Sequence, residues 1–267
     1  ELVAEHPIVD LQVFRERTYA VGVFLMSIVG FVLYGSMVLL PIMMQTLLGY
    51  PAVQAGIALA PRGLGSFLMM PITGILVGKV DPRKLLACGL IVGGGTLIWL
   101  GRMNLNVGYW DLFWPQLIQG AGLSMLFVPL TTVAMANISR ERMGNATSLF
   151  NLMRNIGGSV GIAAAGTMVG RQTQSMTAVF GANISAMDPE TQSMFAQIRG
   201  GFMAAGADAV TATNQAYGAL FGMLQRQASM VSFVTLFELM GGIFLIMLPL
   251  LLLMKRPRAG AGPVAAH

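Results

Sequence analysis

The sequence predicts an all-α membrane protein, a polytopic bundle of six helices that cross a lipid bilayer. Hydrophobic residues make up 55% of the 267 residues and charged residues only 10%, a balance outside the range of soluble globular domains. Six separate apolar runs also have close to the roughly 20 residues that cross a hydrocarbon core. Because lipid offers no hydrogen-bond partners, each run must satisfy its own backbone as a helix.

The first element is a cytoplasmic lead-in over residues 1–18. Its apolar residues Ile8, Leu11 and Phe14 recur at helical spacing, and Arg15 and Arg17 follow them. This pattern favours a helix that lies in the membrane interface, with an ordinary linker as the alternative. The six predicted spans follow over residues 19–44, 53–77, 84–101, 110–136, 146–169 and 228–254.

The longest connection is the segment 170–227 between the fifth and sixth spans, which we predict to be an outer loop. Asp188 and Pro189 mark a turn or a helix start within it, since both residues favour such positions. Farther on, apolar residues recur at three- and four-residue steps from Tyr217 to Val231. We therefore expect a helix to run outward from the sixth span past the membrane surface. Residues 255–267 form a predicted cytoplasmic tail.

The basic residues predict the orientation. Ten of the sixteen lie before the first span or after the second, fourth and sixth spans, which are gaps on one side of a membrane. They are Arg15, Arg17, Lys79, Arg83, Lys84, Arg140, Arg142, Lys255, Arg256 and Arg258. The positive-inside rule places this side, and with it both ends of the sequence, in the cytoplasm at a cell (inner or plasma) membrane. Trp99, Trp110 and Trp114 fall near the opposite ends of the third and fourth spans, where an outer aromatic belt is expected.

Other functional classes lack the residues that they need. The basic residues are dispersed in short loops, so we expect no nucleic-acid partner. Cys88 is the only cysteine, which leaves no disulfide framework or metal cluster and predicts a small apolar packing role. A rhomboid-like serine protease would need a base beside Ser124. The only histidines, His6 and His267, stand at the two ends of the sequence, so we expect no enzyme.

Two motifs stand at the spacing of a known transporter superfamily. In the fourth span, Gln116, Gln119, Gly120 and Gly122 resemble the R-x-x-Q-G-x-G motif of the major facilitator superfamily, with glutamine in place of its arginine. Between the second and third spans lies a degenerate form of that superfamily's G-x-L-A-D-R-x-G-R-R/K loop. This loop motif comprises Gly74, Gly78, Lys79, Asp81, Arg83 and Lys84. Gly78 replaces the acidic residue of the motif, and Asp81 only partly offsets that loss.

Longer stretches narrow the resemblance. Residues 7–15, 40–61 and 144–163 are similar to segments of the fourteen-span drug:proton antiporters of the EmrB/QacA type, and the similarity covers nearly the whole sequence. The resemblance implies the C-terminal six-helix half of a rocker-switch transporter that lacks its N-terminal half here, with substrate bound between the halves.

The same resemblance implies proton-driven efflux of hydrophobic or cationic drugs or related amphipathic compounds. It implies no cofactor beyond a proton gradient. Its expected partners are the lipid bilayer, the N-terminal half of the same transporter and a hydrophobic small-molecule substrate, and it leaves room for a periplasmic adaptor. Two alternatives stay open: a major facilitator exporter of a specific metabolite or lipid, and a membrane binding protein that transports nothing.

Polar residues inside the spans form the candidate site, because burying a charge in a bilayer costs about 3 kcal/mol even on lenient scales. Arg154 leads them, with Asn151 and Asn155 beside it in a span that the resemblance places at the central cavity. The alternative for Arg154 is snorkelling to the cytoplasmic surface or an interhelical hydrogen bond. The other candidates for substrate binding or gating are Arg62, Gln116, Gln119, Gln45 and Tyr34. A structural role is the alternative for each of them, and for the glutamines and Tyr34 this role is an interhelical hydrogen bond.

Glu238 is the only carboxylate well inside a predicted span. It is a weak candidate for proton coupling, because the resemblance places the sixth span outside the cavity. Gly157, Gly161 and Ala165 recur at four-residue intervals in the fifth span. Small residues at this spacing let two helix backbones approach closely, so we expect a packing face there.

Overall fold

The computed structural model describes residues 11–183 and 188–253, and every regular element within them is a helix. This confirms the predicted all-α class. The first four predicted spans match, to within two residues at each end, the helices α1 (Arg17–Thr46), α2 (Ala52–Val77), α3 (Pro82–Leu100) and α4 (Tyr109–Met135). The fifth predicted span lies within a longer helix, α5 (Met143–Asn183). The sixth begins inside α7 (Ala209–Ile246) and extends eight residues past its end, to residue 254, which lies outside the described residues. After α7, the 3-10 helix η3 (Leu248–Leu253) includes Pro249, which has no N–H to continue the α-helix.

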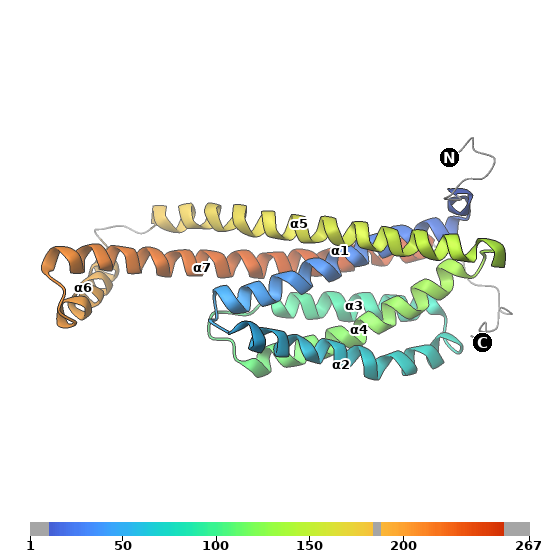
Figure 1. Ribbon diagram of the computed structural model, residues 1–267, viewed down its shortest axis with the longest axis horizontal. Helices are drawn as coiled ribbons and strands as arrows, with labels where there is room; N and C mark the ends of the chain where they lie inside the picture. Colours follow the sequence, from blue (N-terminus) through green and yellow to red (C-terminus); the bar gives the residue numbers. More distant parts are fainter. Residues whose placement is uncertain (1–10, 184–187, 254–267) are drawn as a thin grey trace.

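Of the helices in the described residues, five are long and apolar enough to cross a membrane. They are α1, α2, α3, α4 and α7 with its continuation to Leu252. α5 has 41 residues and is also long enough, but polar residues such as Arg154 and Asn155 lower its apolar character. α5 packs along α1 and α7 (Figure 1). Its place in the bundle therefore agrees with a sixth crossing, which stays a prediction.

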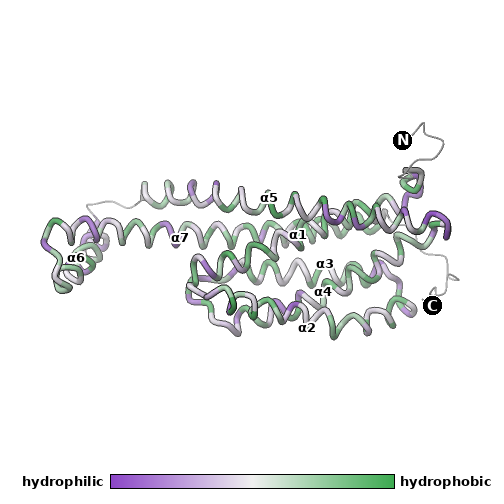
Figure 2. The backbone as a smooth tube through the Cα atoms, in the orientation of Figure 1, coloured by the Kyte–Doolittle hydropathy of each residue, from purple (hydrophilic) through white to green (hydrophobic). Residues whose placement is uncertain are grey.

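The turns place the basic residues at one end of the bundle. The start of α1, the α2–α3 turn and the α4–α5 turn all lie at the right-hand end of Figure 1. This end carries Arg15, Arg17, Lys79, Arg83, Lys84, Arg140 and Arg142. The three remaining basic residues of the predicted cytoplasmic group lie outside the described residues. Hydrophobic colours dominate the helices of the bundle body in Figure 2. The side of the membrane on which this end lies stays a prediction.

The described part of the lead-in is a 3-10 helix, η1 (Leu11–Arg15), instead of the longer interfacial helix expected over residues 7–14. Residues 7–10 of that expected helix lie outside the described residues. Val13 is buried, and the ring of Phe14 meets the ring of Tyr19 edge-on at a centroid distance of 5.6 Å. The Tyr19 hydroxyl donates a hydrogen bond to the carbonyl of Ala146 at 2.8 Å. These contacts hold the lead-in against the first turns of α1 and α5.

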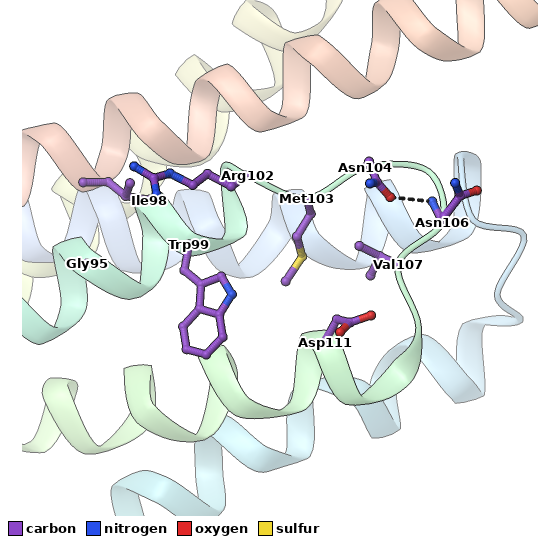
Figure 3. A pocket seen from close by; sticks show the side chains of 9 residues that line it. All are labelled: Gly95, Ile98, Trp99, Arg102, Met103, Asn104, Asn106, Val107 and Asp111. Carbon is purple, nitrogen blue, oxygen red and sulfur yellow. Dashed lines mark hydrogen bonds between the residues drawn. The ribbon is translucent and has the colours of Figure 1, made fainter.

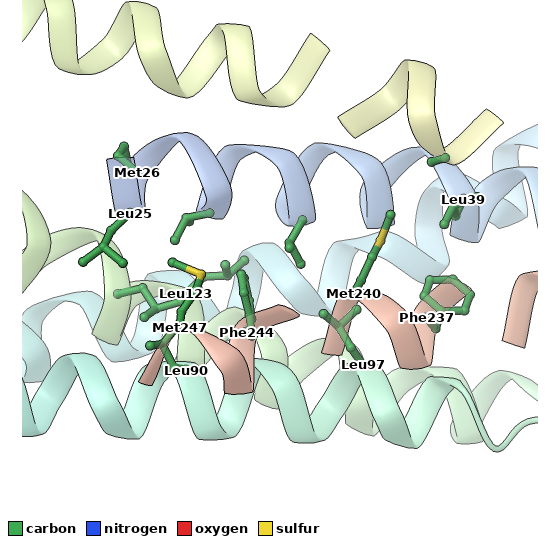
Figure 4. Close-up of a cluster of buried hydrophobic side chains, with 14 of the residues drawn as sticks. Leu25, Met26, Leu39, Leu90, Leu97, Leu123, Phe237, Met240, Phe244 and Met247 are labelled. Atoms are coloured by element: carbon green, nitrogen blue, oxygen red, sulfur yellow. The ribbon is translucent and has the colours of Figure 1, made fainter. Parts of the chain in front are cut away.

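The core lies between α1, α3, α4 and α7. Figure 4 shows Leu39 of α1, Leu97 of α3, Leu123 of α4, and Met240 and Phe244 of α7 converging on it. α2 and α5 lie at the margins of this core and leave large apolar side chains exposed, among them Phe67, Ile75 and Val160. On α3 the buried residues Leu86, Gly89, Leu90 and Gly93 recur at three- and four-residue steps.

Cys88 is exposed, so the packing role predicted for it is wrong. It falls between the buried positions Leu86, Gly89 and Leu90 on the face of α3 that turns away from the core. The apolar run that contains Cys88 predicts a helix, but it does not specify which face of that helix is covered.

The predicted outer loop over residues 170–227 is more helical than expected, and its place on the outer side stays a prediction. α5 continues to Asn183, α6 spans Pro189–Ala204, and α7 begins at Ala209 instead of near Tyr217. The helix start predicted at Asp188 and Pro189 is confirmed, with Asp188 as the N-cap of α6. Figure 1 shows that α5, α6 and α7 project beyond the ends of α1 to α4.

Helix caps and helix packing stabilise the parts of α5, α6 and α7 that lie outside the apolar runs. The Asp208 side chain caps α7 by accepting hydrogen bonds from the backbone N–H groups of Val210 and Thr211 at 3.1 and 3.3 Å. Gly206, with φ of 99°, supplies the turn between α6 and α7. The rings of Phe195 and Tyr217 lie 4.6 Å apart where α6 packs on α7. The helices in this segment therefore support one another.

Candidate functional site

α2 and α4 approach each other closely through glycines. The Cα of Gly120 on α4 lies against the backbone carbonyl of Arg62 on α2, and a Cβ at position 120 would collide with it. Gly65 of α2 lies in the same way against the backbone of α4. The hydroxyl of Ser66 donates to the carbonyl of Gly120 at 2.8 Å, and the hydroxyl of Ser124 donates to the carbonyl of Ser66 at 2.9 Å. The two helices are thus joined by backbone contact and by polar side chains.

Arg62 lies inside this contact and is only 7% exposed. Its Nε donates to Oε1 of Gln116 at 2.7 Å, and its Nη2 donates to Oε1 of Gln119 at 2.7 Å. Both glutamines are buried. We refer to Arg62, Gln116 and Gln119 as the Arg62 cluster. All three were predicted as separate candidates, and the structure brings them into direct contact.

The Arg62 cluster has hydrogen-bond donors to spare. Within the described residues, Nη1 of Arg62 and Nε2 of Gln116 are buried and have no hydrogen-bond partner. The acceptors that Arg62 does have are neutral amide oxygens. A buried cation that is held only by neutral acceptors is costly, so this cluster is a functional candidate on physical grounds.

A cavity of about 400 Å³ reaches the Arg62 cluster from the surface. Arg62 lines it together with the apolar side chains of Met37 on α1, Leu59 on α2 and Leu123 on α4. Met37 and Gly63, which also line it, are exposed. The cavity therefore opens on a surface that α1 and α2 leave uncovered. An apolar cavity with a few convergent polar groups is typical of a small-molecule site.

Gln116 stands where the superfamily motif has arginine. In the structure, the guanidinium of Arg62 on another helix lies beside Gln116. Arg62 of α2 donates to the side chain of Gln116, so the cation comes from α2 and the amide from α4. Sequence reasoning missed Ser66 and Ser124, which join the same two helices. Ser66 follows Arg62 by one helical turn, and this spacing was the available signal.

A second close helix contact joins α1 and α5. Gly157 and Gly161 of α5 lie against the carbonyl oxygens of Ser27 and Phe31 on α1. Ala165, four residues farther along, is also buried. The predicted small-residue packing face is therefore confirmed. Gly30 of α1 completes the contact, since it lies against the backbone carbonyl of Arg154.

The candidates on α5 lie at this contact with α1, away from the Arg62 cluster. Arg154 is half-buried, and its Nε is buried without a hydrogen-bond partner among the described residues. Nδ2 of Asn151 donates to the carbonyl of Thr147 in its own helix at 3.0 Å, and Asn155 is exposed. Arg154 thus keeps one buried N–H donor without an acceptor in the described residues. The two asparagines are not part of the Arg62 cluster.

Tyr34 and Gln45 of α1 make only local contacts. The ring of Tyr34 lies against Gly158 of α5, so it fills the α1–α5 contact. Gln45 is exposed near the end of α1, where its Nε2 donates to the carbonyl of Pro41 at 3.2 Å. The structure brings neither residue into the Arg62 cluster.

Glu238 also lies away from the predicted site. Its side chain is exposed and lies beside Gly101, the residue that ends α3. Because it lies beside Gly101, Glu238 is level with the end of α3 instead of deep within the bundle. α7 packs mainly on α3 and α5, and α2 is not among its main packing partners in the described residues. Glu238 and Arg62 therefore lie on helices that do not pack closely together.

The loop motif forms the turn between α2 and α3. Asp81 caps α3 by accepting from the backbone N–H of Arg83 at 3.0 Å, and Pro82 is the first residue of the helix. Gly78 ends α2 with φ of −78°, a conformation open to any residue. Nε of Arg83 is buried without a hydrogen-bond partner in the described residues. The other members, Gly74, Lys79 and Lys84, are exposed.

A larger cavity, of about 750 Å³, lies at the opposite end of the bundle between the ends of α3 and α4 (Figure 3). Trp99, Arg102 and Asp111 line it. Oδ1 of Asn104 accepts from the backbone N–H of Asn106 at 2.9 Å and shapes the turn. None of the predicted site residues lines this cavity.

Comparisons with known proteins show which family the sequence resembles. A family model described as Major Facilitator Superfamily matches residues 3–162. The chain is 31% identical to the multidrug export protein EmrB of Escherichia coli, over 100% of this chain and 51% of that protein. It is 36% identical to EmrB of Haemophilus influenzae over 60% of this chain and 32% of the relative. It is 35% identical to the fatty acid resistance protein FarB of Neisseria gonorrhoeae over 63% of this chain and 33% of the relative. The chain spans about half the length of the Escherichia coli relative.

Proposed function

Because the chain belongs to the major facilitator superfamily, we propose that it is the C-terminal six-helix half of a proton-driven exporter of hydrophobic or cationic drugs or related amphipathic compounds. It is a multi-pass membrane transporter related to EmrB multidrug exporters and not an enzyme. In such transporters, substrate binds between two helical halves that rock against each other.

The observation that carries the proposal is the cavity at Arg62. It combines apolar walls from Met37, Leu59 and Leu123 with one guanidinium that has an unpaired donor. Such a surface suits a compound with an apolar body and a polar group. The cavity opens toward a surface that α1 and α2 leave uncovered, as a site between two halves requires.

Partners follow from the uncovered faces of the bundle. α2 and α5 leave Phe67, Ile75 and Val160 at least half exposed. In a bilayer such faces pack against lipid or against further helices. We propose the N-terminal half of the same transporter as the partner for these faces, with both ends of this chain in the cytoplasm. A periplasmic adaptor at the opposite end, where α5, α6 and α7 project, is part of the same proposal.

A second candidate is export of one lipid-like metabolite. Similarity to a protein named for fatty acid resistance supports it, as does the positive charge of Arg62 at the cavity. A broad panel of compounds distinguishes the two candidates, because a multidrug exporter confers resistance to several chemical classes and a dedicated exporter to one.

The test is dye efflux from cells that carry the complete transporter, compared with cells that lack it. We expect several chemically distinct dyes to leave the cells faster, and collapse of the proton gradient to stop the efflux. Flat traces for every dye would contradict export and favour a membrane protein that only binds. Efflux that persists without a proton gradient would contradict proton coupling.

A further inference from the structure

The Arg62 cluster lacks a hydrogen-bond acceptor. Oε1 of Gln116 and Oε1 of Gln119 are both occupied by the guanidinium. Nη1 of Arg62 and Nε2 of Gln116 are buried donors without a partner in the described residues. Rotation of the two side-chain amides would not supply the missing acceptor. A guanidinium only donates hydrogen bonds, so each amide must keep its oxygen toward Arg62.

The cluster also lacks a negative charge. A guanidinium keeps its positive charge at neutral pH, and Arg62 is 7% exposed with neutral acceptors for both of its hydrogen bonds. One chemical group meets both deficits at once. A carboxylate has two acceptor oxygens and a negative charge, and its hydrogen bonds to arginine are among the strongest in proteins.

The cavity provides a path for such a group. Arg62 lies in its wall, and the surrounding side chains of Met37, Leu59 and Leu123 are apolar. An acid with an apolar body can therefore place its carboxylate on Arg62 while its body lies along α1 and α4. A cationic compound in the same position would meet the like charge of Arg62, so the cationic drugs of the proposed function would bind at other positions in the complete transporter.

We propose that the Arg62 cluster binds the carboxylate of an amphipathic acid, as the head-group site of the export function proposed above, on which this inference rests. Nη1 of Arg62 is the donor to the carboxylate, because Arg62 is the member of the cluster that lines the cavity. The rival source of a carboxylate is an acidic side chain elsewhere in the complete transporter. Binding of a free acid distinguishes these two sources.

The test measures binding to the purified complete transporter by isothermal titration calorimetry. Three probes share one apolar body and differ in the head group: 4-phenylbutyrate, 4-phenylbutan-1-ol and 4-phenylbutylamine. We expect the acid to bind about tenfold or more tightly than the alcohol, since charge-assisted hydrogen bonds form only with the acid. We expect the amine to bind more weakly than the alcohol because of charge repulsion.

The decisive variant is Gln116→Glu. It sets a carboxylate against Arg62 and removes the free Nε2 donor, with almost no change in side-chain shape. We expect the affinity for 4-phenylbutyrate to fall to that for 4-phenylbutan-1-ol. The binding of the alcohol itself reports whether the variant is folded. The matched control is Gln215→Glu, which makes the same charge change at an exposed position of α7 and should leave the preference for the acid intact.

Two results would overturn the inference. Equal affinity for the acid and the alcohol in the parent transporter would show that the cluster is already neutralised by an internal acidic side chain. A preference for the acid that survives Gln116→Glu would place the carboxylate site elsewhere. The export proposal fails separately: a transporter with the expected binding pattern but no dye efflux keeps the carboxylate site and loses the export function.

Discussion

Replacing Gly161 by alanine should destabilise the complete transporter by forcing α1 and α5 apart. A Cβ at position 161 would lie 2.8 Å from both the Cα and the carbonyl carbon of Phe31, and closer still to its carbonyl oxygen. These are backbone atoms of a helix, so no rotation of a side chain relieves the overlap. The two helices must separate or slide past each other.

The size of the effect follows from these distances. Carbon atoms in contact lie about 3.5–4.0 Å apart, so the helices must separate by roughly 0.7 Å or more at Phe31. Overpacking of this kind lowers the free energy of unfolding by about 1–3 kcal/mol. At about 2–4 °C per kcal/mol for a chain of this size, the melting temperature should fall by about 2–12 °C.

The assay is thermal melting of the purified protein in detergent, followed as loss of the monodisperse peak in size-exclusion chromatography. Gly166→Ala is the matched control, because it lies on the same helix and no atom lies within 4 Å of its Cβ position. The control should melt at the temperature of the parent protein or up to about 4 °C above it, because alanine is favoured over glycine within a helix by about 1 kcal/mol. Equal melting temperatures for Gly161→Ala and Gly166→Ala would refute the close approach of α1 and α5.

Three further outcomes are expected. Arg154→Ala in the complete transporter should abolish drug resistance and leave membrane insertion unchanged, whereas Arg171→Ala on the exposed continuation of α5 should keep resistance; unchanged resistance would remove Arg154 from the site. Arg226→Leu should speed amide hydrogen exchange at the end of α1, because Nε and Nη2 of Arg226 donate to the carbonyl of Leu47 at 3.0 and 2.6 Å; an unchanged exchange rate would contradict this cap. Cys88, exposed on α3, should resist maleimides in intact membranes and react after denaturation in detergent, because a thiol that faces hydrocarbon does not ionise to the reactive thiolate. Rapid labelling in intact membranes would contradict its place in a span.

The helix boundaries could be predicted where lipid dictates them. α1 to α4 begin and end within two residues of the apolar runs, because a backbone in lipid must be helical throughout. α5 and α7 extend past their runs because they pack on each other, and α7 also packs on α6. Outside the bilayer, helical structure depends on such packing and on caps such as Asp208, which hydropathy does not detect.

The burial of single residues could be predicted only where a pattern implies a partner. Gly157 and Gly161 form a small-residue stripe, which itself indicates a close helix neighbour, and the structure places α1 there. Cys88 and Tyr34 carry no such pattern. One is exposed and the other packs on Gly158, and both outcomes depend on how the neighbouring helices are placed.

The Arg62 cluster could not be predicted as a unit, because Arg62 and Gln116 lie 54 residues apart in the chain. The sequence of α4 alone has glutamine, Gln116, at the arginine position of the motif. In the structure, the guanidinium of Arg62 from α2 contacts this glutamine. In a helix bundle the same point can be reached by side chains from two neighbouring helices. A guanidinium carried by either helix can therefore occupy that point. Arg62→Gln leaves the cavity without this cation, and Gln116→Arg sets two cations against each other. The double variant carries one cation and one amide again, so we expect it to recover the preference for 4-phenylbutyrate that each single variant loses. A double variant no better than either single one would show that the helix that carries the guanidinium matters as much as the charge.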